Sequence, residues 1–283
     1  MRQTLDFIRH HPLSGQRWLG AYARFFGWQA RSRIWRVKHR IDWIEGSVLL
    51  VSKGMTGATG NIYCGLHEFA DMEFLLHFLR PDDLFLDIGA NVGSYTVLAS
   101  KVVGARTIAF EPDPGTAAHL ADNIDANAIA QAVTVHQVAL GPTDGTVAFT
   151  VGLDTTNRVA TPGQSNTRTV PVRRLDGIDG ADQAVFAKID VEGFEREVFR
   201  GADGILAAPN LMALATELDD PEIEQVLTGY GFQKFAYDPC ARQLRTTPIP
   251  GLRQSNAIYA RNVDAVAARL ASSPKRSWRG LTI

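Results

Sequence analysis

Residues 84–114, LFLDIGANVGSYTVLASKVVGARTIAFEPDP, constrain the fold of this chain more than any other segment. The pattern predicts an apolar strand over residues 84–88, a glycine turn, and an amphipathic helix over residues 93–103. A second apolar strand over residues 106–110 ends directly before Glu111. The order of strand, glycine turn, helix, strand and acid is typical of a site for a nucleoside-containing cofactor.

The glycine turn narrows the choice of cofactor. A nicotinamide dinucleotide fingerprint would need glycines at Asn91 and Ser94, whereas the chain has the pattern Asp87-x-Gly89-x-Asn91-x-Gly93. A bulkier turn that carries an acid suits a cofactor without a pyrophosphate. S-adenosylmethionine (SAM) is such a cofactor, and we expect Asp87 to accept from its ammonium group, directly or through water.

The acid after the second strand completes this expected site. Glu111 lies about twenty residues past the glycines, where an acid can hold both ribose hydroxyls. The glycines allow backbone N–H groups to approach the ligand, and the helix N-terminus adds unpaired donors and a partial positive charge. We therefore expect Asp87, Gly89, Asn91, Gly93 and Glu111 to bind the cofactor.

Several further segments occur in an order that resembles one family. The stretches GANVGSYT, AFEPDP, AHLADNIDAN, VHQVALG and KIDVEGFEREVFRGA are similar to those of the FkbM-type SAM-dependent methyltransferases, over residues 65–218. The resemblance implies a class I, Rossmann-like fold and O-methylation of hydroxyls on sugars, polyketides and related products. The acceptor it favours is a sugar hydroxyl of a glycan or glycosylated metabolite. It also implies a cofactor or acceptor contact for Glu68.

The pattern along the chain predicts an α/β fold with a doubly wound, mostly parallel sheet. Expected strands of the sheet are residues 84–88, 107–110, 133–137, 184–189, 211–216, 232–237 and 257–260. Expected helices are residues 68–79, 93–103, 115–127, 195–200 and 222–229. Residues 146–151 and 169–172 are expected to form an inserted strand pair, with a polar loop over residues 154–167 that is long enough to act as a lid.

We expect three parts along the chain. Residues 1–65 form a basic appendage of helices and a β-hairpin, residues 66–264 the methyltransferase domain, and residues 265–283 a tail. The hairpin is predicted over residues 41–52, and the glycine- and threonine-rich residues 53–65 are predicted to be a loop. The basic residues 272–283 are expected to lack stable structure.

Composition limits the classes of function. The chain has 283 residues, 45% hydrophobic residues and a net charge of −1, so no nucleic-acid partner is expected. Cys64 and Cys240 lack metal-ligand spacing, and neither a membrane span nor a signal peptide is evident. These features favour a protein of the reducing cytoplasm.

The first 40 residues carry nine Lys or Arg side chains against Asp6 alone, with aromatic residues interleaved at positions 18, 22, 25, 26, 28 and 35. This segment has three interpretations: packing on the core or on a second subunit of a homo-oligomer, contact with an anionic membrane surface, or binding of an anionic polymer such as an acidic polysaccharide. The second interpretation would place the protein at the inner membrane surface.

The residues expected to act on the acceptor also follow predicted strands. Asp190 and Glu192 lie two apart on an extended segment and are predicted to act as general base, with Lys188 holding a carboxylate or contacting substrate. Glu217 follows the next strand and is expected beside the acceptor. The alternative is that Asp190, Glu192 and Glu217 hold Mg²⁺, which would polarise the hydroxyl.

Val138 and Ala139 follow a strand where the adenine edge commonly lies, so their backbone groups are expected to contact the cofactor. The functions that remain open are a nicotinamide-dependent oxidoreductase and a non-catalytic SAM-binding scaffold. The glycine pattern argues against the first, and the pair of Asp190 and Glu192 argues against the second.

Overall fold

The computed structural model describes residues 1–35, 37–151, 158–161, 164–216 and 220–282, and most of them surround one central sheet. In chain order the strands of this sheet are β3 (Leu84–Ile88), β4 (Arg106–Phe110), β5 (Val133–His136), β9 (Phe186–Ile189), β10 (Ala213–Thr216), β11 (Gln233–Asp238), β12 (Gln243–Arg245) and β13 (Ala257–Ala260). Across the sheet their order is β12-β11-β13-β10-β9-β3-β4-β5.

The pairing confirms the expected doubly wound, mostly parallel sheet. Strands β5, β4, β3, β9 and β10 are all parallel to one another, whereas β13 runs antiparallel to both β10 and β11. The chain leaves β3 toward β4 on one side and later returns to β9 on the other. The carboxyl end of β3 is therefore a topological switch point, the place where open α/β sheets form ligand crevices.

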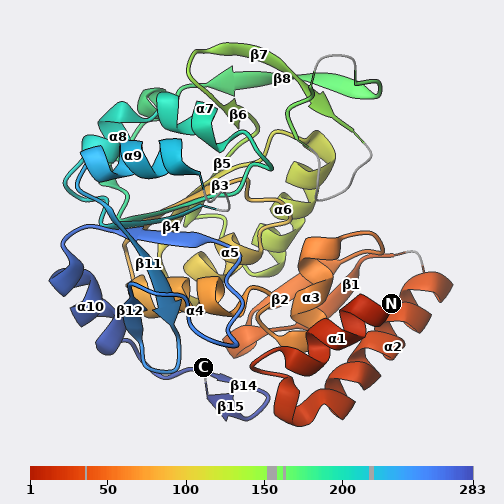
Figure 1. Ribbon diagram of the computed structural model, residues 1–283. Coiled ribbons are helices and arrows are strands. Elements are labelled where there is room, and N and C mark those ends of the chain that lie inside the picture. The colour runs from red at the N-terminus through yellow and green to blue at the C-terminus, as the bar shows by residue number, and fades with distance from the viewer. Residues whose placement is uncertain (36, 152–157, 162–163, 217–219, 283) are drawn as a thin grey trace.

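Helices cover both faces of the sheet. They are α4 (Phe69–Phe78), α5 (Ser94–Val97), α6 (Pro114–Ala126), α7 (Glu195–Arg200), α8 (Asp203–Ala207), α9 (Pro221–Gly229) and α10 (Val263–Ala271). Helices α7, α8 and α9 lie on one face, and α4, α5 and α10 lie on the other (Figure 1). Each face has a hydrophobic core, one around Phe74 and Phe186 and the other around Leu86 and Phe199.

The helical segments after β3 and β4 form where their sequences predict. The helical segment that starts with α5 continues as a π-helix over Leu98–Val103, so it spans the expected residues. Helix α6 begins with Asp113 as N-cap, whose carboxylate accepts from the Thr116 N–H, and has Pro114 in its first turn. Short 3₁₀ turns occupy Gly15–Arg17, Ile44–Gly46, Leu175–Gly177 and Ala181–Gln183.

A small sheet lies beside the carboxyl ends of the central strands. It contains β6 (Ala139–Leu140), β7 (Gly145–Thr150) and β8 (Thr167–Arg173), in the order β6-β8-β7. The expected inserted strand pair is confirmed, with β6 as an additional member. Residues 152–157 and 162–163 of the expected lid loop lie outside the described residues, so that loop's role stays a prediction.

The N-terminal part contains α1 (Arg2–His10), α2 (Trp18–Ile34), β1 (His39–Asp42), β2 (Val48–Val51) and α3 (Thr56–Cys64). The expected hairpin is confirmed by the antiparallel pairing of β1 and β2. The prediction of a loop over residues 53–65 is wrong, because α3 forms there. Tertiary contacts override its weak helix propensity: the Arg24 Nε of α2 donates to the last-turn carbonyls of Ile62 and Tyr63, at 3.1 and 3.0 Å.

The aromatic residues of the N-terminal helices divide between the core and the surface. Phe25 and Trp28 of α2 are buried in the same hydrophobic cluster as α4. Phe26 and Trp35 are about half exposed, at 51% and 56%. Within the described residues, no helix is both long enough and apolar enough to cross a membrane.

The C-terminal residues also fold, contrary to expectation. Strands β14 (Ser277–Trp278) and β15 (Leu281–Thr282) form a small antiparallel hairpin. Trp278 is 5% exposed, and a Cβ added to Gly65 would lie 2.8 Å from its indole ring. The bare glycine therefore allows the indole to pack against the N-terminal part, a long-range contact that local composition does not reveal.

Candidate functional site

The turn after β3 touches the backbone that follows β9. Gly89 has φ +81°, and a Cβ at this position would lie 1.8 Å from the carbonyl oxygen of Asp190. Its N–H donates to Phe110 O at 3.0 Å, which holds the turn against the end of β4. Asn91 also has a left-handed φ, +53°. The glycine is thus required by both its backbone angle and the close approach.

Glu111 extends from the end of β4 to this turn. Its Oε2 accepts from the Asn91 N–H at 3.0 Å, and its Oε1 accepts from the Asp113 N–H at 2.9 Å. The residue is 7% exposed, and burial raises its pKa to about 7 despite these two bonds. Each carboxylate oxygen retains a lone pair, so it can accept a further hydrogen bond from a ligand hydroxyl.

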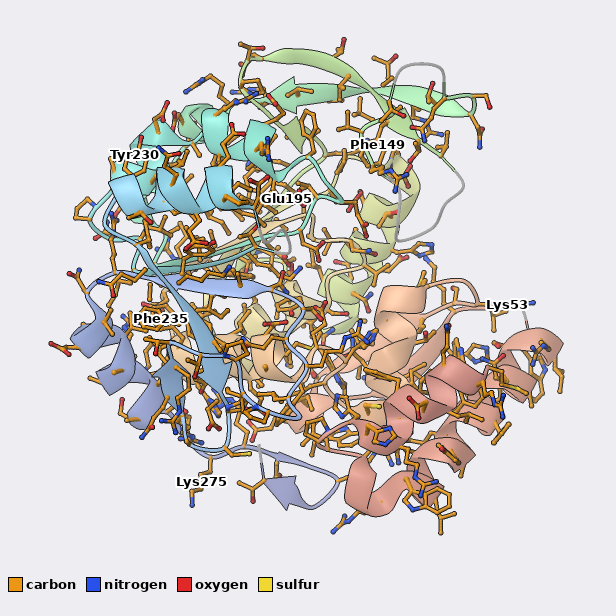
Figure 2. The ribbon with its side chains drawn as sticks, in the orientation of Figure 1. Lys53, Phe149, Glu195, Tyr230, Phe235 and Lys275 are labelled. Atoms are coloured by element: carbon orange, nitrogen blue, oxygen red, sulfur yellow. The ribbon has the colours of Figure 1, made fainter. Side chains whose placement is uncertain are left out.

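A pocket opens at this point, with an empty volume, open mouth included, of about 580 Å³. The pocket is lined by Ile88, Gly89, Asn91, Phe110, Glu111, Pro112, Val138, Ala139, Leu140, Phe149, Val159, Asp190, Val191, Glu192 and Phe194. Figure 2 shows Phe149, on the small sheet, and Glu195, at the start of α7, on the same side of the central sheet.

The pocket brings together most of the residues that the sequence singled out. Gly89, Asn91 and Glu111 lie at the ends of β3 and β4, while Val138 and Ala139 lie at the small sheet. Asp190 and Glu192 line the same pocket from the loop after β9. Of the expected residues that the structure describes, four do not line it: Glu68, Asp87, Gly93 and Lys188.

Asp87 lies beneath the turn. It is 1% exposed, its Oδ2 accepts from Thr96 Oγ1 at 2.6 Å, and burial raises its pKa to about 6 although Lys188 opposes the shift. Gly93 caps α5 with φ +90°, and a Cβ there would meet the Leu120 side chain at 2.5 Å. Asp87 and Gly93 therefore hold the turn after β3 in place without lining the pocket.

Lys188 occupies the centre of a buried cluster of acids. It is 2% exposed, and its Nζ contacts Asp190 Oδ2 at 2.5 Å and lies 4.5 Å from the ring centre of Tyr95. Burial alone would lower its pKa, but the charges of Asp190, Glu68 and Asp87 raise it above the usual value. Lys188 is therefore a fixed cation that holds the Asp190 carboxylate in place.

The loop after β9 has an unusual backbone. Glu192 has φ +54°, and Gly193 follows with φ +94°. The buried Glu195 stabilises this loop, because its Oε1 accepts from the N–H groups of Val191 and Gly193, both at 3.2 Å. The strained residue is thus held by α7, and such strain is concentrated at functional sites. Burial and the charges of Asp190 and Glu195 raise the pKa of Glu192.

Three residues that the sequence analysis passed over belong to this region. Tyr95 donates its hydroxyl to Glu68 Oε2 at 2.6 Å, and Glu195 holds the loop after β9. Asp71 of α4 is 2% exposed and accepts from Asn256 Nδ2 at 3.2 Å; burial and Glu68 raise its pKa. The one local signal was Tyr95, which lies directly after the glycine turn. Asp71 and Asn256 meet only in three dimensions.

Glu217 lies outside the described residues, so its expected place beside the acceptor stays a prediction. Among the residues that are described, no group of three His, Cys, Asp or Glu side chains could hold a metal ion. The Mg²⁺ alternative therefore gains no support from Asp190 and Glu192, which lack a third described ligand.

Comparison with known proteins identifies relatives among methyltransferases. The chain is 26% identical over 162 residues to the hexuronic acid methyltransferase AglP of Haloferax volcanii, which covers 56% of this chain and 66% of that protein. It is 30% identical over 150 residues to Methyltransferase 1 of Beauveria bassiana, over 44% and 60% of the two lengths. The chain thus spans less than two thirds of the curated relatives it matches.

Solved structures with a similar fold are more distant. A putative tRNA (m1A22) methyltransferase of Streptococcus pneumoniae is 16% identical, with a TM-score of 0.41 over 68% of this chain and 69% of that one. A SAM-dependent O-methyltransferase of Thermotoga maritima is 14% identical, with a TM-score of 0.39 over 69% and 64%. Neither likeness bears on function.

The family model described as the methyltransferase FkbM domain matches residues 87–234, from Asp87 of β3 into β11. The match includes Glu111, Asp190 and Glu192, which line the pocket. Because the matched region is more than half of the sequence, the chain belongs to the FkbM methyltransferase family.

Proposed function

We propose that this protein is a SAM-dependent O-methyltransferase that modifies a hydroxyl group of a sugar, in a glycan or a glycosylated metabolite. The observation that carries the proposal is the pocket at the switch point, which has Glu111 on one strand end and Asp190 with Glu192 on another. Glu111 suits the ribose of a nucleoside, and Asp190 with Glu192 supplies the carboxylates that an acceptor hydroxyl requires.

The residues of the pocket fit the nucleoside end of SAM. The two Glu111 oxygens already accept backbone N–H groups and are positioned to accept from ribose hydroxyls as well. Val138, Ala139 and Phe149 provide apolar surface for a flat base. When it is bound, SAM supplies an electrophilic methyl group on a sulfonium centre.

Asp190 and Glu192 differ in the roles they can take. The contact with the Lys188 ammonium at 2.5 Å favours an ionised, fixed Asp190, which orients the acceptor by accepting a hydrogen bond. Glu192 makes no described ion pair and has a raised pKa, so its carboxylate is the better proton acceptor near neutral pH. In this mechanism Asp190 would orient the acceptor hydroxyl and Glu192 would accept its proton, while bound SAM would supply the methyl group and leave as S-adenosylhomocysteine once its bond from sulfur to the methyl group is broken.

The acceptor class is supported by the relative from Haloferax volcanii, whose name describes a hexuronic acid methyltransferase. A ring with several hydroxyls offers hydrogen bonds to both carboxylates of the pocket. A uronic acid carries a negative charge, which Asp190 and Glu192 would repel at short distance. The sugar hydroxyl should therefore face these two residues, and any carboxylate of the sugar should lie away from them.

The first test is calorimetric titration of the purified protein with S-adenosylhomocysteine, in EDTA and then with Mg²⁺. We expect binding in the micromolar range in both conditions, about −8 kcal/mol. A screen of neutral and acidic sugars for methyl transfer follows. Absence of binding in both conditions, or binding of NADH in its place, would refute the cofactor assignment.

A matched pair of variants separates catalysis from scaffolding. Glu192→Gln retains the size of the side chain but cannot accept the proton, so it should bind S-adenosylhomocysteine normally and lose turnover. Glu197→Gln, on α7 and outside the pocket lining, removes a carboxylate that pairs with Arg200 and should change neither. Equal turnover of the wild type and Glu192→Gln would remove Glu192 as the base.

A further inference from the structure

A second pocket lies between α2 and the C-terminal hairpin, away from the switch point. It is lined by Leu13, Arg17, Trp18, Leu19, Gly20, Arg24, Trp278 and Arg279. Its empty volume, open mouth included, is about 590 Å³. Figure 1 shows β14, β15 and α2 at the lower edge of the molecule, whereas the small sheet beside the first pocket is at the top.

The charge of this pocket is unbalanced. Arg17, Arg24 and Arg279 line it, and no acidic residue does. Among the ion pairs of the described residues, none involves these three arginines. Burial and the neighbouring Arg279 lower the pKa of Arg24, which shows a cation short of compensating charge.

Backbone carbonyls and aromatic rings hold the arginines in place of carboxylates. The guanidinium of Arg24 lies 5.1 Å from the ring centre of Trp278, and that of Arg279 lies 5.5 Å from it. Arg24 also donates to the carbonyls at the end of α3, and Arg17 Nη1 donates to Arg279 O at 3.0 Å. The cations are thus fixed in position while their charge remains available.

Gly20 keeps the pocket open. A Cβ added to it would lie 3.6 Å from Arg24 Nη1, at ordinary contact distance, so any larger side chain would extend over this nitrogen. A glycine inside a helix lowers the stability of the helix by about 0.5–1 kcal/mol relative to alanine, so Gly20 weakens α2. The exposed Gly27, seven residues further along α2, has no atom within 4 Å of such a Cβ.

We propose that this pocket is a binding site for a phosphate ester. Arginine guanidinium groups bind phosphate oxygens in pairs, and a multiply charged anion balances several cations at once. The flat wall of Trp18 and the side chain of Leu19 leave apolar space for the group esterified to the phosphate. The phosphate is carried either by a soluble molecule, such as a phosphorylated sugar, or by a lipid headgroup.

The test is calorimetric titration of the full chain with inorganic pyrophosphate at low salt. We expect saturable binding to one site, weakened about tenfold or more in Arg17→Gln through loss of a charge-assisted contact. Gly20→Leu should abolish binding by covering Arg24. The matched controls on the same helix are Gly27→Leu and Arg33→Gln, which lie outside the pocket lining and should bind as the wild type does.

Thermal melting of each variant shows whether it is folded, independently of the first pocket. The proposal would be overturned if pyrophosphate did not bind the wild type, or if Arg33→Gln and Arg17→Gln bound it equally weakly.

Cosedimentation with phosphatidylcholine vesicles, with and without phosphatidic acid, distinguishes a lipid headgroup from a soluble phosphate ester. Vesicle binding that depends on phosphatidic acid and is lost in Gly20→Leu indicates a lipid headgroup, while pyrophosphate binding without vesicle binding indicates a soluble phosphate. Vesicle binding that survives Gly20→Leu would contradict a role for this pocket at membranes.

Discussion

Gly89→Ala tests whether the close contact between the β3 turn and the loop after β9 shapes the active site. The added Cβ would lie 1.8 Å from Asp190 O, whereas real Cβ contacts under 3.0 Å essentially never occur. The turn and the loop must therefore separate by more than 1 Å. Because Asp190 and Glu192 are on that loop, the expected loss of turnover is about a hundredfold, a loss that a 1 Å misplacement can cause.

The matched control is Gly231→Ala. Gly231 has φ +84°, close to the +81° of Gly89, but a Cβ there has no atom within 4 Å. Both variants pay about 1–2 kcal/mol for a left-handed alanine. Gly89→Ala should lose a further 1–3 kcal/mol through overpacking, roughly doubling the fall in the free energy of unfolding.

Urea unfolding measures the stability of both variants, and calorimetry with S-adenosylhomocysteine followed by a methyl-transfer assay measures the site. We expect Gly231→Ala to retain affinity and turnover and Gly89→Ala to lose both. If the two variants lose equal stability and both retain turnover, the contact with Asp190 has no structural consequence and the reasoning is refuted.

Three further perturbations test the rest of the site. Glu111→Gln should weaken S-adenosylhomocysteine about tenfold or more, since hydrogen bonds to a charged group contribute roughly 1.5–3 kcal/mol; unchanged affinity would exclude a ribose contact. The pKa of Glu111 is raised from 4.5 to about 7, so the folded state holds a proton on this carboxyl group more tightly than the unfolded state does. The contribution of Glu111 to the free energy of unfolding is therefore fully present below pH 4.5 and is lost as the pH rises through about 7. Urea unfolding of the unliganded protein should show that loss, up to about 3 kcal/mol, and Glu111→Gln should remove it. Lys188→Met should lower the free energy of unfolding by about 3–5 kcal/mol, because it leaves the buried carboxylates around it without their cation. If the variant were as stable as the wild type, those carboxyl groups would have to be protonated in the absence of the lysine. In Glu192→Gln turnover should fall about 10²–10⁴-fold, and in the wild type the rate should fall as the pH drops through the raised pKa of Glu192, because protonation removes the base.

Much of the pocket was predictable because its residues come directly after strands. Periodicity located β3, β4 and β9, and parallel strands bring their carboxyl ends to one edge of a sheet. Gly89, Glu111 and Asp190 were expected at that edge for this reason, and they line one pocket. The expected doubly wound sheet follows from the same alternation of strands and helices.

The residues beneath the pocket were less predictable. Asp87 lies buried against Thr96, so its expected contact with the cofactor stays a prediction, and Lys188 was assigned no definite partner. Which side of the sheet a strand residue faces depends on register: Asp87 is paired with Lys188 across β3 and β9, a pairing that joins residues 101 positions apart. No local pattern reports such a pairing.

The two errors at the edges of the chain have a common cause. Residues 56–64 form α3, whose carbonyl end accepts hydrogen bonds from Arg24, and residues 277–282 form a hairpin whose Trp278 packs against Gly65. Both segments are poor in local signals, with glycine and threonine in one and basic residues in the other. Each is stabilised by a contact with a distant segment, so neither structure is encoded in the segment alone.

By itself, the amino-acid sequence determined the strand and helix pattern, the glycine turn and the acid that follows β4, since these depend on local periodicity and backbone freedom. Only the tertiary structure decided which carboxylates share a cation, how Glu192 is held with a left-handed backbone, and that three arginines meet at a pocket between α2 and the C-terminal hairpin. The physical reason is that charge and burial act through space. The pKa of a carboxyl group and the availability of an arginine depend on neighbours that the chain brings together only when it folds.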